Sequence, residues 1–271
     1  MMRSMSIVAV VGAGVMGETL VSGLLRGGRR PDELLIAERR GERAAELQER
    51  YGVEVVGNVD AAQKADTLVL VVKPQDMGEV LDEIAPHVSP ATTVVSLAAG
   101  ITTAFIEARL PSRVPVVRVM PNTPALVDEG MAAISRGSSC DEAHLVEAEQ
   151  LLAATGKVLR VPEKQQDAVT AISGSGPAYL FFVVEAMIEA GVHLGLPRST
   201  SSELVVQTVV GSAKLLRETG EHPTVLRERV TSPGGTAAAA VRELEDHKVR
   251  AAFLTAMEAA RNRSRDLSAG G

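Results

Sequence analysis

The sequence has no tryptophan, two tyrosines and four phenylalanines among its 271 residues, and its formal net charge is −6. Proteins that bind nucleic acid stack bases on aromatic side chains or carry basic surfaces. We therefore expect no nucleic-acid partner. The single cysteine, Cys140, cannot form an intramolecular disulfide, which is typical of a protein in the reducing cytoplasm. Its neighbours, residues 137–141, predict a polar turn.

Metal-ligand spacing and long apolar runs are also missing. The five histidines share no spacing typical of a metal site or of a nucleophile system, so no metal is expected. No uncharged apolar run reaches the roughly 18 residues that span a membrane, so no membrane partner is expected either. Arg3 and the run 5–11 imitate a signal peptide, but the glycine turn that follows favours a strand and a helix.

The sequence does have the composition of a folded, soluble protein, with 45% hydrophobic and 23% charged residues. Up to about residue 162, short β-branched runs alternate with amphipathic stretches, which predicts helices packed on a parallel sheet. The expected strands are residues 7–11, 34–37, 53–56, 67–72, 93–97, 114–119, 131–135 and 158–161. Strand 67–72 is apolar on both faces and is expected in the centre.

After Pro162 the sequence changes to stretches rich in alanine and leucine at helical spacing. The expected helices are residues 164–194, 199–219, 224–229, 235–245 and 249–267. Segment 178–191 is apolar nearly all round except for Glu185 and Glu189. A helix buried on most sides needs a partner, so we expect a homo-oligomer built through this helical half.

A glycine motif follows the first expected strand and opens a helix. It consists of Gly12, Ala13, Gly14, Val15, Met16 and Gly17. In this context Gly12 permits a tight turn, Gly14 lets a pyrophosphate approach, and Gly17 lets the helix pack on the strand. A glycine turn without a ligand is the alternative.

The alternating strands and helices, the glycine motif and the helical second half together predict an α/β fold. We expect a Rossmann-like, mostly parallel sheet domain over residues 1–163 and an all-helical domain over residues 164–271.

Charged residues at the end of the second expected strand give conflicting signals. Glu38 stands about 20 residues after Gly17, where an acidic residue holds the ribose diol of NAD. Arg39 and Arg40 follow, and a guanidinium pairs well with the 2′-phosphate of NADP. A solvated helix start is the alternative for these charges. Because the carboxylate can turn to solvent, NADP(H) is favoured and NAD(H) is the second option.

Further candidates follow the third to sixth strands, at the edge where open α/β sheets bind ligands. They are Asn58, Val71, Val72, Lys73, Pro74, Ala98, Ala99 and Asn122. Lys73 suits a ribose or phosphate, or is an ordinary surface lysine. Asn122 suits a nicotinamide carboxamide, or caps its turn.

Two segments of the helical half, residues 173–177 and 231–236, run into helices through hydroxyls, a proline and glycines. Free N–H groups at such a helix start bind a small carboxylate. Each segment is equally well explained as a capped helix start.

These motifs together resemble the pyrroline-5-carboxylate reductases. The resemblance rests on residues 12–17, 72–74, 98–100, 120–124, 167–170, 173–179 and 232–236, in the order and spacing of that family. It implies reduction of the cyclic imine of 1-pyrroline-5-carboxylate to L-proline with NADPH or NADH, the last step of proline biosynthesis. It also implies a helical C-terminal dimerisation domain that interlocks two subunits, with dimers often gathered into decamers.

The resemblance also implies roles for individual residues. Cofactor contacts fall on the glycine motif, Asn58, residues 71–74 and Leu97 to Ala99, with Arg39 beside the ribose. Substrate contacts fall on Glu163 and on Ser232, Gly234, Gly235, Thr236 and Ala237. Ser232 and Thr236 are the catalytic candidates. Hydride transfer to a protonated imine needs mainly alignment and an anchor for the carboxylate, which suits so few titratable groups.

The chain departs from the family pattern at two positions. Glu38 stands where family members commonly have asparagine, and Ala237 stands where they usually have a threonine whose hydroxyl meets the ring nitrogen. Thr236 or a water can replace that hydroxyl, so we expect a slower enzyme. The alternatives are a reductase of another small cyclic imine or β-hydroxy acid, and a cofactor-binding regulator that has lost catalysis. Segment 178–191 lacks the lysine or histidine that the hydroxy-acid chemistry needs.

Overall fold

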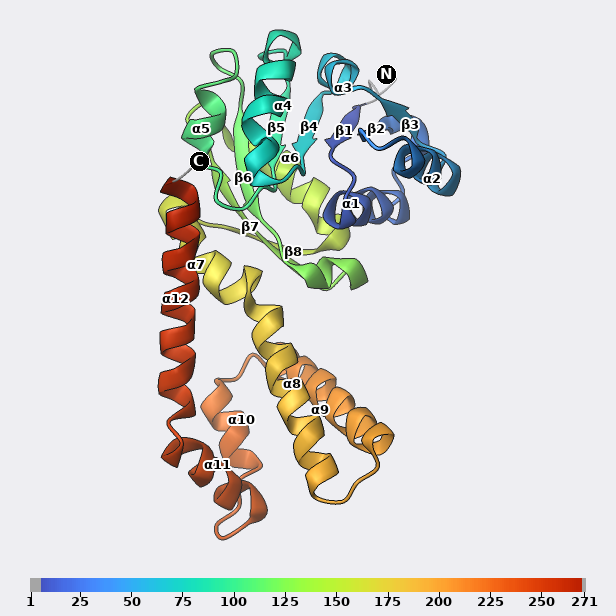
Figure 1. Ribbon diagram of the computed structural model, residues 1–271. Coiled ribbons are helices and arrows are strands. Elements are labelled where there is room, and N and C mark those ends of the chain that lie inside the picture. The colour runs from blue at the N-terminus through green and yellow to red at the C-terminus, as the bar shows by residue number, and fades with distance from the viewer. Residues whose placement is uncertain (1–5, 270–271) are drawn as a thin grey trace. The chain divides into compact units, whose positions relative to one another are not determined.

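The computed structural model describes residues 6–269 and contains one eight-stranded sheet in the order β3-β2-β1-β4-β5-β6-β7-β8 (Figure 1). Each strand expected from the sequence is present, with ends that differ by up to two residues. The strands are β1 (Val8–Val11), β2 (Leu34–Ala37), β3 (Glu54–Val56), β4 (Thr67–Leu70), β5 (Thr93–Ser96), β6 (Val116–Met120), β7 (Gly130–Arg136) and β8 (Gly156–Arg160). The start of the run that imitates a signal peptide, up to Met5, lies outside the described residues.

One neighbouring pair, β6 and β7, is antiparallel, and the other pairs are parallel. Residues 121–129 connect these two strands. A parallel pair needs a crossover of a dozen or more residues, so this short connection reverses the chain direction. The expectation of a mostly parallel sheet is confirmed, and β7 and β8, which are parallel to each other, run opposite to the other strands.

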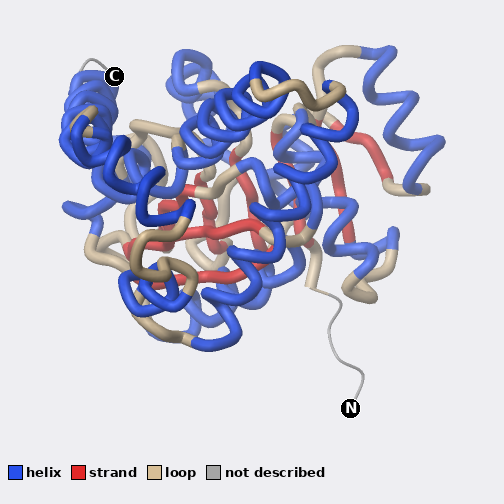
Figure 2. The backbone as a smooth tube through the Cα atoms, turned by 90° about the horizontal axis from the view of Figure 1, so that it is seen from below, coloured by secondary structure: helices blue, strands red, loops and turns tan. Residues whose placement is uncertain are grey.

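Helices cover both faces of the sheet (Figures 1 and 2). One face carries α1 (Val15–Arg26), α2 (Gly41–Tyr51) and α6 (Glu142–Leu152). The other face carries α3 (Asn58–Lys64), α4 (Met77–Ile84) and α5 (Thr103–Glu107). The sheet is therefore buried from both sides, as the apolar strands predict.

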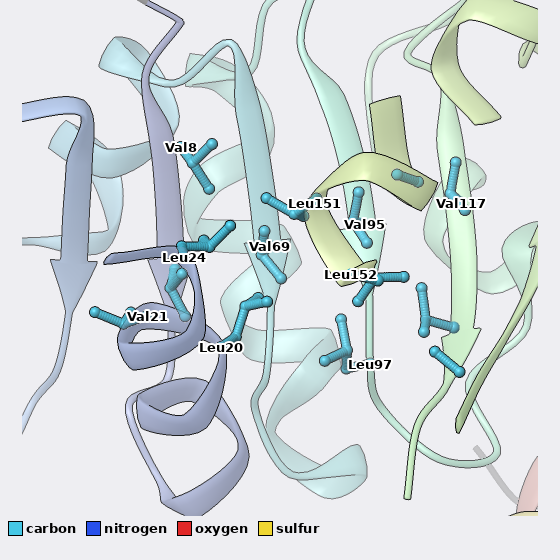
Figure 3. Close-up of a cluster of buried hydrophobic side chains, with 14 of the residues drawn as sticks. Val8, Leu20, Val21, Leu24, Val69, Val95, Leu97, Val117, Leu151 and Leu152 are labelled. Atoms are coloured by element: carbon cyan, nitrogen blue, oxygen red, sulfur yellow. The ribbon is translucent and has the colours of Figure 1, made fainter. Parts of the chain in front are cut away.

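Figure 3 shows the core on the α1 side of the sheet. Side chains of α1 and α6 meet side chains of the central strands there, and the labelled ones are Val8, Leu20, Val21, Leu24, Val69, Val95, Leu97, Val117, Leu151 and Leu152. Burying one such aliphatic side chain contributes about 1.5 to 3 kcal/mol. This core fixes the strand ends that carry the candidate site.

The chain divides into two compact units. The first unit holds residues up to Ser175 together with those from Ala260 onward, and the second holds Gly176–Ala259. The sequence pattern places the boundary earlier, after residue 163. The difference arises because Gln166 is fully buried and donates to the Ala133 carbonyl and the Ser135 hydroxyl on β7.

The last helix, α12 (Val249–Ala269), ends in the first unit. The Ser264 hydroxyl donates to Asp167 over 2.8 Å. A Cβ atom on Gly100 would lie 3.4 Å from the Cβ atom of Leu267. The chain therefore leaves the first unit after Ser175 and completes it with residues that come after the second.

Cys140 follows the polar turn that its neighbours predict, but its own side chain is buried. The residue is 4% exposed, and its thiol donates to the Val116 carbonyl. Burial raises the pKa of this thiol above its ordinary value of 9.0. The polar neighbours make the turn, while the sulfur packs inward as a small hydrophobic group.

We predict that the Cys140 thiol is protected in the folded protein. A thiol-reactive chromogenic disulfide should modify it at least about 100-fold more slowly in buffer than in denaturant, because only the exposed thiolate reacts. A Cys140→Ser variant supplies the background rate. Rapid stoichiometric labelling of the native protein would contradict the burial.

The expected single helix 164–194 is a series of helical segments. A 3₁₀ turn (Glu163–Gln165), α7 (Gln166–Val169), a π-helical turn (Thr170–Gly174) and α8 (Gly176–His193) follow one another. The Ser175 amide donates to the Thr170 carbonyl over 2.8 Å, which continues the helical run. An open helix start with free N–H groups at residues 173–177 was therefore a wrong expectation.

The second unit contains α8, α9 (Arg198–Thr219), α10 (Pro223–Arg229), α11 (Thr236–Asp246) and the first part of α12. Its described residues include three that are buried, Pro177, Ser201 and Val205. Phe181 is 67% and Phe182 is 72% exposed. Helices with so much apolar surface need a further partner to cover it.

The helical run Glu163–His193 is long and apolar enough to cross a membrane, judged by length and composition alone. The sequence analysis did not predict such a helix, because it searched for apolar runs without any charged residue. The same composition suits a helix covered by another subunit.

Candidate active site

A cleft of about 370 Å³ opens at the carboxyl ends of β1, β2 and β4. These three strands lie side by side in the sheet (Figure 1). The lining residues are Val11, Gly12, Gly14, Ala37, Glu38, Arg39, Arg40, Asn58, Val71, Val72, Lys73, Asp76 and Val80. The fold thus gathers residues from four sequence-predicted segments into one place.

The glycine motif forms the turn between β1 and α1. Gly12 has φ +91°, a conformation that L side chains rarely adopt, and a Cβ atom there would lie 2.8 Å from the Val71 carbonyl oxygen. A Cβ atom on Gly17 would collide with the Gly12 carbonyl. These two glycines are required by the protein's own packing.

Gly14 differs from the other two glycines, because a Cβ atom there would meet nothing within 4 Å. It is the N-cap residue of α1 and has no side chain to bond the first N–H groups of the helix. The space beside Gly14 and the uncapped positive end of α1 fit the pyrophosphate of a dinucleotide.

Glu38 follows β2 and faces the cleft. Its side chain is 8% exposed, and Arg40 donates to both carboxylate oxygens, from Nε over 3.0 Å and from Nη2 over 3.1 Å. The Arg40 side chain lowers the pKa of the Glu38 carboxyl below its ordinary value of 4.5. The carboxylate is thus ionised and held inward, so it does not turn to solvent as the NADP(H) expectation required.

Arg39 is exposed like Arg40, with 63% of its side chain accessible against 67% for Arg40. Its guanidinium nitrogens lie 3.9 Å from carboxylate oxygens of both Asp76 and Glu79. The lining of the cleft holds two acidic side chains, Glu38 and Asp76, and three basic ones, Arg39, Arg40 and Lys73. Its charged residues therefore carry a small excess of positive charge.

The loop expected to bind substrate lies in the second unit, before α11. Gly234 has φ +70°, and the Gly235 amide donates to the Ser232 carbonyl over 3.0 Å. Gly235 is the N-cap of α11 and has no side chain, so the first N–H groups of the helix are not capped by it. Ser232 and Thr236 are exposed, and Ala237 is half-buried.

Glu163 lies in the first unit, at the start of the helical run. Its carboxylate accepts from the Thr103 amide over 2.7 Å and from the Thr103 hydroxyl over 2.6 Å. Arg118 donates to the same carboxylate over 3.2 Å. The side chain remains 28% exposed.

Comparison with known proteins decides the family. A model described as pyrroline-5-carboxylate reductase dimerisation matches residues 163–267, and one described as NADP oxidoreductase, coenzyme F420-dependent, matches residues 7–100. A pyrroline-5-carboxylate reductase from Corynebacterium melassecola is 47% identical over 267 residues, covering 97% of this chain and 99% of the relative. The chain belongs to the pyrroline-5-carboxylate reductase family.

Other members of the pyrroline-5-carboxylate reductase family agree along the whole chain. The Mycobacterium tuberculosis reductase is 43% identical and covers 98% of each chain. The solved structure of the Coxiella burnetii reductase has a TM-score of 0.92 at 36% identity, covering 98% of this chain and 99% of that one. The Plasmodium falciparum structure with NADP bound has a TM-score of 0.87 at 29% identity, covering 97% and 98%.

Several cofactor residues expected for a pyrroline-5-carboxylate reductase lie outside the lining of the cleft. They are Ala13, Val15, Met16, Gly17, Pro74, Leu97, Ala98, Ala99 and Asn122. Met16, Leu97 and Asn122 instead surround a small void of about 10 Å³. Within the cleft, the Asn58 amide donates to Glu83 over 2.7 Å.

The Asn122 side chain holds parts of this family member's fold together. Its oxygen accepts from the Met131 amide over 2.8 Å, and its nitrogen donates to the Ser173 hydroxyl over 3.2 Å. These bonds use the carboxamide that we expected to face a nicotinamide. Asn122 thereby ties the end of β6 to β7 and to the π-helical turn.

Sequence reasoning missed four residues of the cleft, Val11, Ala37, Asp76 and Val80, and it found no metal site in this reductase. Val11 and Ala37 end the strands β1 and β2, directly before the motifs that were predicted. Asp76 and Val80 reach the cleft only because α4 folds against β4, which no local pattern reveals. Among residues 6–269, no group of three or more histidine, cysteine, aspartate or glutamate side chains is placed to hold a metal ion.

Proposed function

We propose that this protein reduces 1-pyrroline-5-carboxylate to L-proline with a nicotinamide dinucleotide. The 47% identity to a reductase of that name over 97% of the chain carries the proposal. The geometry of the dinucleotide cleft supports it independently, because the uncapped helix α1 and the open space at Gly14 suit a pyrophosphate.

The bound dinucleotide supplies the hydride that adds to the imine carbon. The chain has to hold the substrate so that its protonated C=N bond faces the nicotinamide. We assign the substrate carboxylate to the first N–H groups of α11, with the Ser232 and Thr236 hydroxyls as further donors. Gly234 and Gly235 leave room for the carboxylate. We assign to Glu163 a contact with the protonated ring nitrogen, whose positive charge a carboxylate stabilises.

The decisive experiment follows oxidation of NADPH and of NADH at 340 nm with 1-pyrroline-5-carboxylate as substrate. We expect turnover, together with rescue of a bacterial proline auxotroph by the gene. A folded protein that oxidises neither dinucleotide would instead support a cofactor-binding regulator. Turnover only with other cyclic imines would redirect the substrate assignment.

We infer that NADH is used at least as efficiently as NADPH. The Glu38 side chain is 8% exposed, and its ionised carboxylate is held inward at the end of β2, where it opposes a 2′-phosphate. This inference is opposite to the preference for NADP(H) that the two neighbouring arginines suggest in the sequence. A kcat/KM for NADPH more than threefold above that for NADH would contradict it.

We predict that the Ala237→Thr substitution raises kcat by about fivefold. The new hydroxyl would restore a hydrogen bond to the ring nitrogen, which is worth about 1 kcal/mol. Ala237→Val is the matched control, because it adds similar bulk without the hydroxyl. If the kcat of Ala237→Thr is no higher than that of Ala237→Val, the hydroxyl has no role at this position.

We also propose a cytoplasmic homodimer formed through the second unit, with decamers built from dimers as the larger assembly. The exposed Phe181 and Phe182, and the dimerisation model that matches residues 163–267, support the dimer. Light scattering coupled to gel filtration should give at least twice the chain mass of 28.5 kDa. A mass of one chain would contradict the proposal.

A further inference from the structure

Arg118 is an unusual residue for the interior of a sheet. Strand β6 reads Val116-Val117-Arg118-Val119-Met120, and the Arg118 side chain is 6% exposed. Taking a guanidinium out of water is costly unless charged or polar partners replace the water. An aliphatic residue would fill the position at lower cost, so the arginine calls for a functional explanation.

The partner of Arg118 is the Glu163 carboxylate, which we assign to the substrate under the proposed function. Arg118 Nη1 donates to Glu163 Oε1 over 3.2 Å. The Thr103 amide donates to the same oxygen, and the Thr103 hydroxyl donates to Oε2. Thr103 is 5% exposed and is the first residue of α5. One carboxylate thus joins β6, α5 and the start of the helical run.

The neighbours of Arg118 are polar as well. Its register partners, Ser96 on β5 and Ser135 on β7, are both buried, and Gln166 donates to the Ser135 hydroxyl over 2.8 Å. This polar layer begins at Ser96, the carboxyl end of β5, next to residues 97–99 that the resemblance assigns to the cofactor. A sheet otherwise packed with aliphatic side chains becomes polar where ligands of such folds bind.

We propose that Arg118 and Thr103 are positioning residues that hold the Glu163 carboxylate for the imine substrate. The inference rests on the proposed function, in which Glu163 meets the ring nitrogen. Three donors fix Glu163 from the protein side, while 28% of its side chain remains accessible. Thr103 directly follows loop 97–102, which contains residues that we expect to contact the cofactor. The bonds from Thr103 therefore connect the Glu163 side chain to this loop.

The test compares Arg118→Met with Arg118→Lys by steady-state kinetics on the full-length reductase, varying the imine and the dinucleotide separately. We expect Arg118→Met to lower kcat/KM for 1-pyrroline-5-carboxylate by about tenfold or more, since a hydrogen bond to a charged group is lost. The KM for the dinucleotide should change less than about twofold. Arg118→Lys keeps the charge and should recover most of the loss.

A double-mutant cycle separates positioning from general support of the fold. Glu163→Gln alone should lower kcat/KM for the imine by about tenfold. Because Arg118 acts through Glu163, adding Arg118→Met to that variant should reduce kcat/KM by no more than about twofold further. A merely structural role would instead give losses that multiply and that fall on both substrates.

Thr103→Val supplies a second route if Arg118→Met does not fold. It removes one hydroxyl donor to Glu163 and keeps the side-chain volume, and Thr103→Ser should restore the rate. The matched control is Thr93→Val, which breaks the 2.8 Å hydrogen bond from Thr93 to Glu147 at the opposite ends of the strands. That control should leave the kinetics unchanged.

The outcomes distinguish this inference from the proposed function. If the wild-type protein reduces the imine and both Arg118→Met and Thr103→Val have the same kcat/KM, the proposed function stands and the positioning role is overturned. Multiplying losses in the double variant would also overturn it. A wild-type protein that does not reduce the imine would overturn both.

Discussion

Replacing Gly14 with alanine should raise the KM for the dinucleotide by at least about tenfold, which corresponds to about 1.4 kcal/mol. The new methyl group meets no protein atom within 4 Å, and the backbone at Gly14, with φ −66°, suits alanine. The group would occupy space where we place the pyrophosphate. The melting temperature should fall by no more than about 4 °C, since replacing an N-cap glycine with alanine costs up to about 1 kcal/mol.

Two further glycine variants make this experiment specific. Gly41→Ala also begins a helix and meets nothing within 4 Å, but it lies outside the lining of the cleft, so it should leave the KM unchanged. Gly17→Ala collides with the Gly12 carbonyl and should destabilise the fold itself. A folded Gly14→Ala enzyme with normal KM would place the pyrophosphate elsewhere.

The Glu38→Gln substitution should raise the ratio of kcat/KM for NADPH to that for NADH by about ten- to hundredfold. Glutamine keeps the shape of the side chain but removes its charge. Arg40, which now neutralises Glu38, then becomes available to the 2′-phosphate, as does the exposed Arg39. The ratio is measured by initial rates with saturating imine.

Glu46→Gln is the matched control for this change. Glu46 pairs with Arg43 on α2 and does not line the cleft, so the net charge changes equally without altering the ribose end. Raising the salt concentration should reduce the effect of Glu38→Gln only partly, because the Glu38 side chain is 8% exposed. An unchanged ratio would show that Glu38 does not face the ribose.

The sequence predicted the elements of the sheet well, for a physical reason. Runs such as residues 67–70 are apolar on both faces, and only a strand between two helical layers satisfies them. The glycine turn was equally readable, since the φ of +91° at Gly12 is needed by the turn itself and a Cβ atom on Gly17 would collide with the nearby Gly12 carbonyl. Hydrophobic periodicity and backbone sterics act within a few residues, so they can be recognised from the sequence alone.

Features that depend on contacts between distant segments were not predicted. Arg40 is a close neighbour of Glu38 in the sequence, but the inward direction of the Glu38 carboxylate depends on the cleft that distant segments form around it. The Asn122 side chain bonds Met131 across the connection between β6 and β7, and it bonds Ser173 far along the chain. The partners of Glu163, Arg118 and Thr103, were likewise invisible before β6 and α5 were placed.

The path of the chain has a consequence for how the protein is made. A ribosome releases the eight strands before the second unit and the residues from Ala260 onward after it. The first unit therefore waits until the second has been made before Ser264 can bond Asp167 and Leu267 can pack beside Gly100. Until then the apolar helices of the second unit are already exposed, so nascent chains have their subunit surface available before their own first unit is complete.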